Sequence, residues 1–263
     1  MILSSVDKNS IVKIEEGELI SYQKNGEELI HQKGNPGWKN SDTEMFPIIG
    51  PTEANNFIVS TPKGNCIQDQ HGLLRELKYS TKNQTENTCS FIKKYVASSA
   101  IKNSKYPKKS SAKLLSWPYH FSFIKKYVLT NDSLKISFEI EAEKGMPFML
   151  GYHPAFMLSS NLDELVKSEN KEVTIPEIIK NGSKAFPILN TNEIILVKKI
   201  GSNIKLKTEG FNNFMLWTEV SNMVCIEPIT KYPYTSKKTL TKELFNISDG
   251  KNIFTVIITP FKQ

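Results

Sequence analysis

Two of the four histidines in this chain have neighbours that suit a role in chemistry. His71 lies in the segment Gln70-His71-Gly72, where polar groups surround the imidazole and the glycine permits a tight turn or the close approach of a ligand. His153 ends an apolar, strand-like run and precedes Pro154, which cannot donate to a central strand ladder. An imidazole at such a strand end is expected to point into a cleft. For either histidine alone, a hydrogen-bonded place in the core is the alternative.

A carboxylate in a similar position complements the two imidazoles. Glu227 follows the apolar run Met223–Ile226 and precedes Pro228, so we expect a strand to deliver this acid to its own end and then stop. Burial raises the pKa of a carboxyl group, which suits a base that works near neutral pH. A surface carboxylate at a strand terminus is the alternative. Together, two imidazoles and one carboxylate would suit general acid–base catalysis.

Arg75 is the only arginine in a chain with 34 Lys and Arg side chains. Its planar guanidinium can hold two hydroxyl groups or a phosphate at once, whereas a lysine offers a point charge. An ion pair with Glu76 or Glu44 is the structural alternative. The lysines are scattered, and with 27 acidic residues they leave a formal net charge of +7. Because nucleic-acid recognition relies on guanidinium groups, this composition argues against a nucleic-acid partner.

The three cysteines, Cys66, Cys89 and Cys225, argue against a metal or thiol-exchange site. They are odd in number, far apart and without Cys-x-x-Cys spacing. We expect them to be buried, reduced thiols. The sequence also contains no Gly-x-Gly-x-x-Gly or phosphate-loop lysine motif that would bind a nucleotide. The sequence thus predicts neither a cysteine zinc site nor a nucleotide-binding loop.

The lack of an export signal and the cysteine pattern together predict a cytoplasmic location. No apolar run approaches the ~20 residues that a membrane-spanning helix needs. Residues 1–10 have no basic flank that leads into an apolar stretch, so no export signal is predicted. Reduced cysteines would agree with a reducing compartment.

Alternating apolar and polar residues indicate the elements that must position these groups. In Leu134–Glu141 every even position is apolar and every odd position is polar, the pattern of a half-buried strand. Turn residues such as Asn25-Gly26 and Asp249-Gly250 separate such runs. The other strands predicted in this way are Ile11–Ile14, Leu19–Tyr22, Leu29–His31, Phe57–Ser60, Phe121–Leu129, Met149–Tyr152, Ile204–Thr208, Phe214–Trp217, Met223–Ile226 and Ile253–Thr259.

Helical periodicity is limited to one or two turns at Leu162–Lys167 and Leu240–Phe245. We therefore predict an all-β chain of stacked antiparallel sheets with few short helices. No Gly/Ser-rich or Pro-rich linker interrupts it, so residues 1–263 are expected to form a single domain.

One segment of seven residues occurs twice: residues 90–96 and 122–128 both read Ser-Phe-Ile-Lys-Lys-Tyr-Val. A repeat array needs at least three copies. The two copies are therefore interpreted as two similar strands that expose lysines on one face, and no function is inferred from them.

Five motifs, taken together and in this order, resemble those of the aldose 1-epimerase (galactose mutarotase-like) superfamily. They are Phe46-Pro-Ile-Ile-Gly50, Gln70-His-Gly-x-x-Arg75, Trp117-Pro-Tyr-x-Phe121, Gly151-Tyr-His-Pro-Ala-Phe156 and Ile226-Glu-Pro228. The resemblance extends from about Met45 to Pro260. The arginine after His-Gly is more similar to the sugar-phosphate-epimerase-like branch than to galactose mutarotase itself.

The resemblance implies a β-supersandwich with an open sugar cleft, and an enzyme that interconverts the α and β anomers of an aldose without a cofactor. It implies that Glu227 is the general base for the anomeric hydroxyl, that His153 is the acid for the ring oxygen, and that His71 binds this oxygen. Arg75 and Gln70 would bind the substrate, a monosaccharide or a sugar phosphate. Trp38 and Trp217 are candidates for a sugar-stacking platform, with packing in the core or in a lid as the alternative.

Two other classes of protein remain open. A carbohydrate-binding or regulatory protein could keep the fold without turnover, although binding alone would need neither an acid nor a base. A lyase or hydrolase on a related sandwich would normally need a second carboxylate across the sugar. The chain also departs from the family pattern after Gly50, where Pro51-Thr52-Glu53 stands in place of a nearby arginine.

Overall fold

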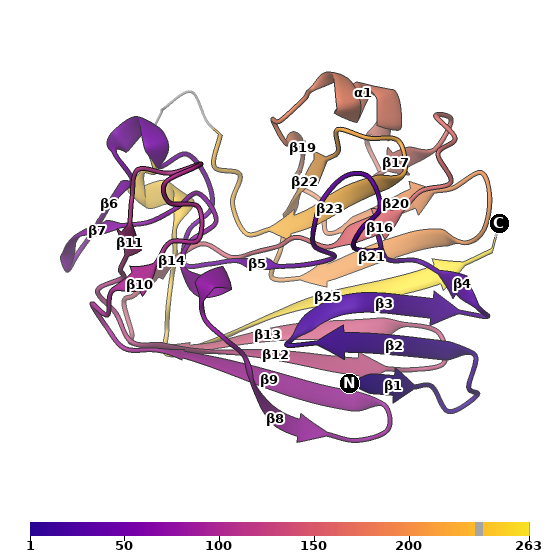
Figure 1. Cartoon of the computed structure of the whole chain (residues 1–263), viewed down its shortest axis with the longest axis horizontal. Helices are drawn as coiled ribbons and strands as arrows, with labels where there is room; N and C mark the ends of the chain where they lie inside the picture. The colour runs from indigo at the N-terminus through magenta and orange to yellow at the C-terminus, as the bar shows by residue number, and fades with distance from the viewer. Residues whose placement is uncertain (235–238, 263) are drawn as a thin grey trace.

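The computed structural model describes residues 1–234 and 239–262, and antiparallel strands dominate it (Figure 1). The largest sheet has nine strands in the order β18-β17-β20-β21-β25-β13-β12-β9-β8. In chain order they are β8 (Ser80–Gln84), β9 (Thr88–Tyr95), β12 (Phe121–Leu129), β13 (Leu134–Ala142), β17 (Leu165–Lys167), β18 (Glu172–Thr174), β20 (Glu193–Val197), β21 (Asn203–Glu209) and β25 (Lys251–Phe261).

A second sheet carries Glu227 and the strand that directly precedes His153. Its strand order is β19-β22-β23-β15-β5, with β16 beside β23. The bounds are β5 (Glu44–Met45), β15 (Gly151–Tyr152), β16 (Ala155–Met157), β19 (Phe186–Leu189), β22 (Asn213–Trp217) and β23 (Met223–Ile229). This sheet lies above the long strands of the nine-stranded sheet in Figure 1.

Smaller elements complete the described part of the chain. The first strands, β1 (Ile2–Ser4), β2 (Ser10–Glu15), β3 (Glu18–Lys24) and β4 (Glu27–Glu28), form a four-stranded sheet. Two-stranded ladders join β6 (Ile58–Thr61) to β7 (Gly64–Ile67), β10 (Ile101–Lys102) to β11 (Leu114–Leu115), and β14 (Pro147–Phe148) to β24 (Asn246–Ile247). The helical elements are α1 (Ile175–Lys180) and the 3-10 turns Glu53–Asn55, Leu74–Glu76 and Lys242–Leu244.

The predicted alternation places one face of each long strand in the core. Along β13, Leu134, Ile136, Phe138 and Ile140 are all buried. The ring of Phe138 lies 5.0 Å from that of Tyr152 in β15, so aromatic packing joins the large sheet to the second sheet. The expectation of an all-β chain of stacked antiparallel sheets is confirmed.

Two local predictions differ from the structure. Leu162–Lys167 was expected to be helical, but Leu165–Lys167 is strand β17, which pairs with β18 and β20. The helix lies after it, at α1, where Thr174 and Glu177 form a capping box and Pro176 occupies the first turn. In the predicted strand Leu29–His31 only Ile30 forms a bridge, to Phe156.

The repeated heptapeptides form neighbouring strands, β9 and β12, but they do not expose all their lysines. Lys93 and Lys125, the first lysine of each pair, are 5% and 0% exposed, whereas Lys94 and Lys126 face solvent. Lys94 and Lys126 thus expose their charges on one face of the two strands, as interpreted, whereas the burial of Lys93 and Lys125 on the other face was not expected. Adjacent residues of a strand point to opposite faces, so one lysine of each pair had to point inward.

The two edge strands of the nine-stranded sheet are irregular or short. Every residue of β8 is exposed, and its register with β9 shifts between Thr81 and Asn83. At the other edge, β18 has three residues.

The three cysteines are free and buried, as expected. No helix in the described part of the chain has both the length and the apolar composition that a membrane crossing requires.

Candidate functional site

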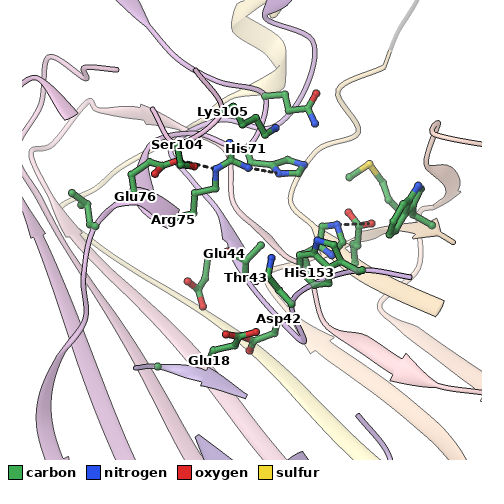
Figure 2. A pocket seen from close by; sticks show the side chains of 18 of the residues that line it. Glu18, Asp42, Thr43, Glu44, His71, Arg75, Glu76, Ser104, Lys105 and His153 are labelled. Carbon is green, nitrogen blue, oxygen red and sulfur yellow. Dashed lines mark hydrogen bonds and ion pairs between the residues drawn. The ribbon is translucent and has the colours of Figure 1, made fainter. Parts of the chain in front are cut away.

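Three segments that are far apart in the sequence meet at a cavity of about 960 Å³. His71 lies in the loop after β7, His153 directly follows β15, and Glu227 lies in β23. All three side chains line the cavity, and Figure 2 shows the two imidazoles from close by. Their ring centroids are 5.8 Å apart.

Glu227 and His153 are in direct contact. Oε1 of Glu227 lies 3.3 Å from Nε2 of His153, and both side chains are buried. Burial raises the pKa of Glu227 to about 8 and lowers the pKa of His153 to about 4. Between these values the two groups together hold one proton. Since burial disfavours separated charges, the favoured form has that proton on Glu227.

The strand that carries Glu227 was expected to end at this residue, but it continues. β23 continues through Pro228 to Ile229. Ile226 and Thr230 donate backbone hydrogen bonds to Pro154 and Leu150, and Pro228 falls between them. The ladder therefore continues with no donor at this one position.

His71 sits in a turn that approaches a neighbouring segment very closely. Gly72 has a φ of +70°, and a Cβ on it would lie 2.1 Å from the carbonyl oxygen of Phe46. The amide of Phe46 in turn donates to the carbonyl of His71 at 3.2 Å. Only glycine fits this crossing, which holds His71 beside Phe46, the residue that directly follows β5.

Arg75 fixes the protonation of His71. Nη1 of Arg75 lies 3.1 Å from Nδ1 of His71. Because a guanidinium can only donate, Nδ1 must accept, and the ring proton is on Nε2. Burial, with the charge of Arg75, holds the pKa of His71 well below its ordinary value. His71 is thus a neutral imidazole whose free nitrogen is a hydrogen-bond donor.

The other nitrogens of Arg75 contact carboxylates. Nη2 lies 2.7 Å from Oδ1 of Asp69, and Nε lies 3.3 Å from Oε1 of Glu76. Lys105 contacts the same oxygen of Asp69 at 3.2 Å. Arg75 lines the cavity, as expected of a substrate-binding residue, and it also forms the pair with Glu76 that was the structural alternative.

The two predicted tryptophans and Gln70 also line the cavity. The ring of Trp38 lies 4.4 Å from the imidazole of His153, tilted by 31°, and the ring of Trp217 lies 6.4 Å from it. Buried His31 donates from Nε2 to the carbonyl of Trp38 at 2.8 Å, so this histidine holds the tryptophan loop.

Residues 17–193 match the family model described as aldose 1-epimerase. The chain belongs to the aldose 1-epimerase family.

Solved structures support the same fold for this family member. A galactose mutarotase-like protein from Lactobacillus casei superimposes with a TM-score of 0.79 at 16% identity, over 99% of this chain and 100% of that chain. A galactose mutarotase related enzyme from Lactobacillus acidophilus gives a TM-score of 0.75 at 19% identity, over 100% of this chain and 98% of that chain. The expectation of a galactose mutarotase-like fold is confirmed.

One curated relative is protein LacX of Lactococcus lactis. It is 26% identical over 148 residues, which are 53% of this chain and 44% of LacX. The chain therefore aligns with less than half the length of that relative.

Sequence reasoning missed two residues that support the site of this aldose 1-epimerase family member. Asp69 orients Arg75, and its place two residues before His71 was a local signal. Lys105 reaches Asp69 across 36 residues and had no such signal. Within the described ranges, no group of three or more His, Cys, Asp or Glu side chains is arranged to hold a metal ion.

Proposed function

We propose that this chain is an aldose 1-epimerase, which interconverts the α and β anomers of an aldose by opening and closing its ring. The observation that carries the proposal is the buried contact of Glu227 with His153, at 3.3 Å, beside the neutral His71. It supplies one proton acceptor, one proton donor and one fixed hydrogen-bond donor in a single cavity.

In the proposed reaction, one proton moves from the sugar to the protein and another moves back. With the shared proton on His153, the Glu227 carboxylate accepts the proton of the anomeric hydroxyl. The oxygen–hydrogen electron pair forms the carbonyl at C1, the bond from C1 to the ring oxygen breaks, and His153 protonates that oxygen. Nε2–H of His71 donates a hydrogen bond to the same oxygen. Rotation about C1–C2 and the reverse steps give the other anomer.

This scheme leaves the Glu227–His153 pair with one proton throughout. Ring opening moves the proton from the imidazole side to the carboxyl side, and ring closure returns it. The total charge in the buried site therefore stays constant, which avoids the cost of creating a net charge away from water. Each correctly placed acid or base typically contributes ~10²–10⁴-fold to the rate.

The substrate contacts follow from the lining of the cavity. Gln70, Arg75 and Trp217 are the groups that we propose to bind sugar hydroxyls or a sugar face, together with the exposed part of Trp38. A free aldose and an aldose phosphate are both compatible with these groups, so both belong in the test.

The test is anomer exchange measured by NMR with free and phosphorylated aldoses. Wild-type protein should accelerate exchange for at least one of them. Glu227→Gln keeps the shape and polarity of the side chain but removes the base, so it should lower the exchange rate by roughly 10²-fold or more while sugar affinity changes little. Sugar binding without exchange in the wild-type protein would instead indicate a non-catalytic carbohydrate-binding protein.

A further inference from the structure

Four charged side chains form a buried cluster next to the histidines, and three of them, Asp42, Glu44 and Lys93, line the same cavity. Asp42, Glu44, Lys93 and Lys125 are 4%, 2%, 5% and 0% exposed. In Figure 2 the carboxylates of Asp42 and Glu44 point away from His71 and His153. The mechanism proposed above uses none of the four.

The four groups form one connected network. Nζ of Lys125 lies 2.7 Å from Oδ2 of Asp42 and 2.6 Å from Oε1 of Glu44. Nζ of Lys93 lies 3.9 Å from Oε2 of Glu44. Burial opposes ionisation of Glu44, yet the charges of Lys125 and Lys93 outweigh it and hold the pKa of Glu44 below its ordinary value.

The network contacts the residue before His153, and its two carboxylates flank the residue that lies opposite His153 on the neighbouring strand. The Tyr152 hydroxyl donates to Oδ2 of Asp42 at 2.7 Å. Thr43, between Asp42 and Glu44, exchanges two backbone hydrogen bonds with His153, at 3.2 and 2.8 Å. Directly opposed residues of an antiparallel pair share a face, so Thr43 faces the site with His153, while Tyr152 and the two carboxylates face the network.

The same network reaches the segment of His71. Nζ of Lys93 donates to the carbonyl of Leu74 at 3.0 Å, next to Arg75. Leu74 donates in turn to Phe46, which also bonds His71 through its amide. Residues 42–46 therefore lie between the two histidine segments, and Lys93 and Lys125 hold this stretch and its neighbours from behind.

Stability gives no reason to retain such a network. Removing four charges from water is costly, and apolar replacements of buried ion pairs are often neutral or stabilising. A buried ionic network can instead fix one relative arrangement of the segments that it joins, where apolar packing would allow several arrangements.

We propose that the network of Asp42, Glu44, Lys93, Lys125 and Tyr152 sets the relative placement of His71 and His153. Its members are proposed as positioning residues, because their side chains contact one another and the carbonyl of Leu74 and not the side chains of Glu227, His71 or His153. The inference rests on the proposed function, since that function makes the placement matter for the rate.

The test compares Tyr152→Phe with Tyr127→Phe. Both phenols are buried and reach Oδ2 of Asp42, at 2.7 Å and 3.5 Å, but Tyr127 donates mainly to the carbonyl of Gly17 at 2.9 Å and lies on β12. Misplaced catalytic groups lose rate steeply. Tyr152→Phe should lower kcat roughly tenfold with KM within about twofold, and should shift the ¹⁵N NMR titration of His153. Tyr127→Phe should lower Tm comparably and leave both readouts unchanged.

A second pair uses the repeated heptapeptide. Lys93→Met keeps the Lys125 ion pairs, so the fold retains one cation beside two carboxylates, and it should change the imidazole signals of His71 but not those of His153. The control, Lys94→Met, removes the exposed lysine of the same pair and should change neither.

Equal effects of the two tyrosine variants on kcat and on the His153 signals, or no effect of Tyr152→Phe, would overturn the inference. So would His71 signals that are the same in Lys93→Met and in wild type. The imidazole signals do not depend on turnover. A wild-type protein that exchanges no anomers would therefore end the proposed function and still leave the positioning role decided by NMR.

Discussion

The proton shared by Glu227 and His153 ties the proposed activity to pH. Above the pKa of Glu227, about 8, both groups lose their protons and no acid remains. Below the pKa of His153, about 4, both groups are protonated and no base remains. We expect kcat/KM to fall on both sides, with apparent pKa values that belong to the pair rather than to either residue.

The variant Glu227→Gln provides the control for this profile, measured on residual activity. It removes the carboxyl group that titrates at the alkaline side, so that limb should disappear. An alkaline limb of unchanged midpoint in this variant would assign the high pKa to another group.

Arg75→Lys tests whether the guanidinium is needed for its shape. Arg75 uses two different nitrogens for Nδ1 of His71 and Oδ1 of Asp69, and a lysine has one nitrogen and no planar fork, so the variant should hold the Nε2–H tautomer of His71 less firmly. Hydrogen bonds of charged groups contribute about 1.5–3 kcal/mol, so we expect KM to rise roughly tenfold or more. Steady-state kinetics and thermal unfolding of the same samples provide the measurement.

The matched control is Lys105→Met, which removes a different cation from the same oxygen of Asp69 and leaves the contact between Arg75 and His71 in place. It should change KM by much less. If Arg75→Lys lowers Tm by several degrees with KM unchanged, Arg75 is a structural ion-pair residue and not a substrate contact.

The candidate residues could be predicted from their types and neighbours, but their partners could not. His71, His153 and Glu227 each have a local signal in a glycine or a proline. The tautomer of His71 depends on Arg75 four residues away, and the charge of Asp69 is balanced by Lys105 across 36 residues. Contacts of this range follow from the way the sheets stack, which no local pattern encodes.

At the scale of elements, the crossing of the His71 turn over Phe46 makes a specific prediction. Gly72→Ala should be destabilising because the new Cβ meets a backbone oxygen at 2.1 Å, which cannot move away as a side chain could. Positive φ alone costs an alanine about 1–2 kcal/mol. Overpacking should add roughly 1–3 kcal/mol, measured by urea unfolding.

Gly64→Ala is the matched control. Gly64 also has a positive φ, of +108°, but nothing lies within 4 Å of the position of its Cβ. Gly64→Ala should therefore lower the free energy of unfolding only by the conformational cost that a positive φ imposes on alanine. Equal losses in the two variants would mean that the crossing relaxes without cost.

Period-two patterns predicted most strands because each pattern is local. In β12 the prediction agreed with the structure at both ends, Phe121 and Leu129. The short strand β17 was taken for a helix, since three residues carry too little periodicity to distinguish the two. The burial of Lys93 and Lys125 was not predicted, because a lysine is normally exposed whatever its place in an alternating pattern. Their carboxylate partners are also distant in sequence.

At the scale of the whole molecule, we propose that residues 1–263 form a single domain. One cluster of buried apolar residues includes Leu3 of β1, Phe138 of β13 and Ile258 of β25. Urea unfolding followed by tryptophan fluorescence and by far-UV circular dichroism should give coincident transitions. Two separated transitions would divide the chain into independent units.

The two edges of the nine-stranded sheet affect whether copies of the chain can associate edge to edge at high concentration. Exposed edge strands offer unpaired backbone groups to another chain, which can extend the sheet without limit. Here β8 carries polar and charged side chains and a register shift that interrupts its ladder, and β18 offers three residues. Irregular or very short edges are poor templates for a further strand. Contacts between copies at these two edges would therefore have to use side-chain surfaces, which can be saturated, and not a growing intermolecular sheet.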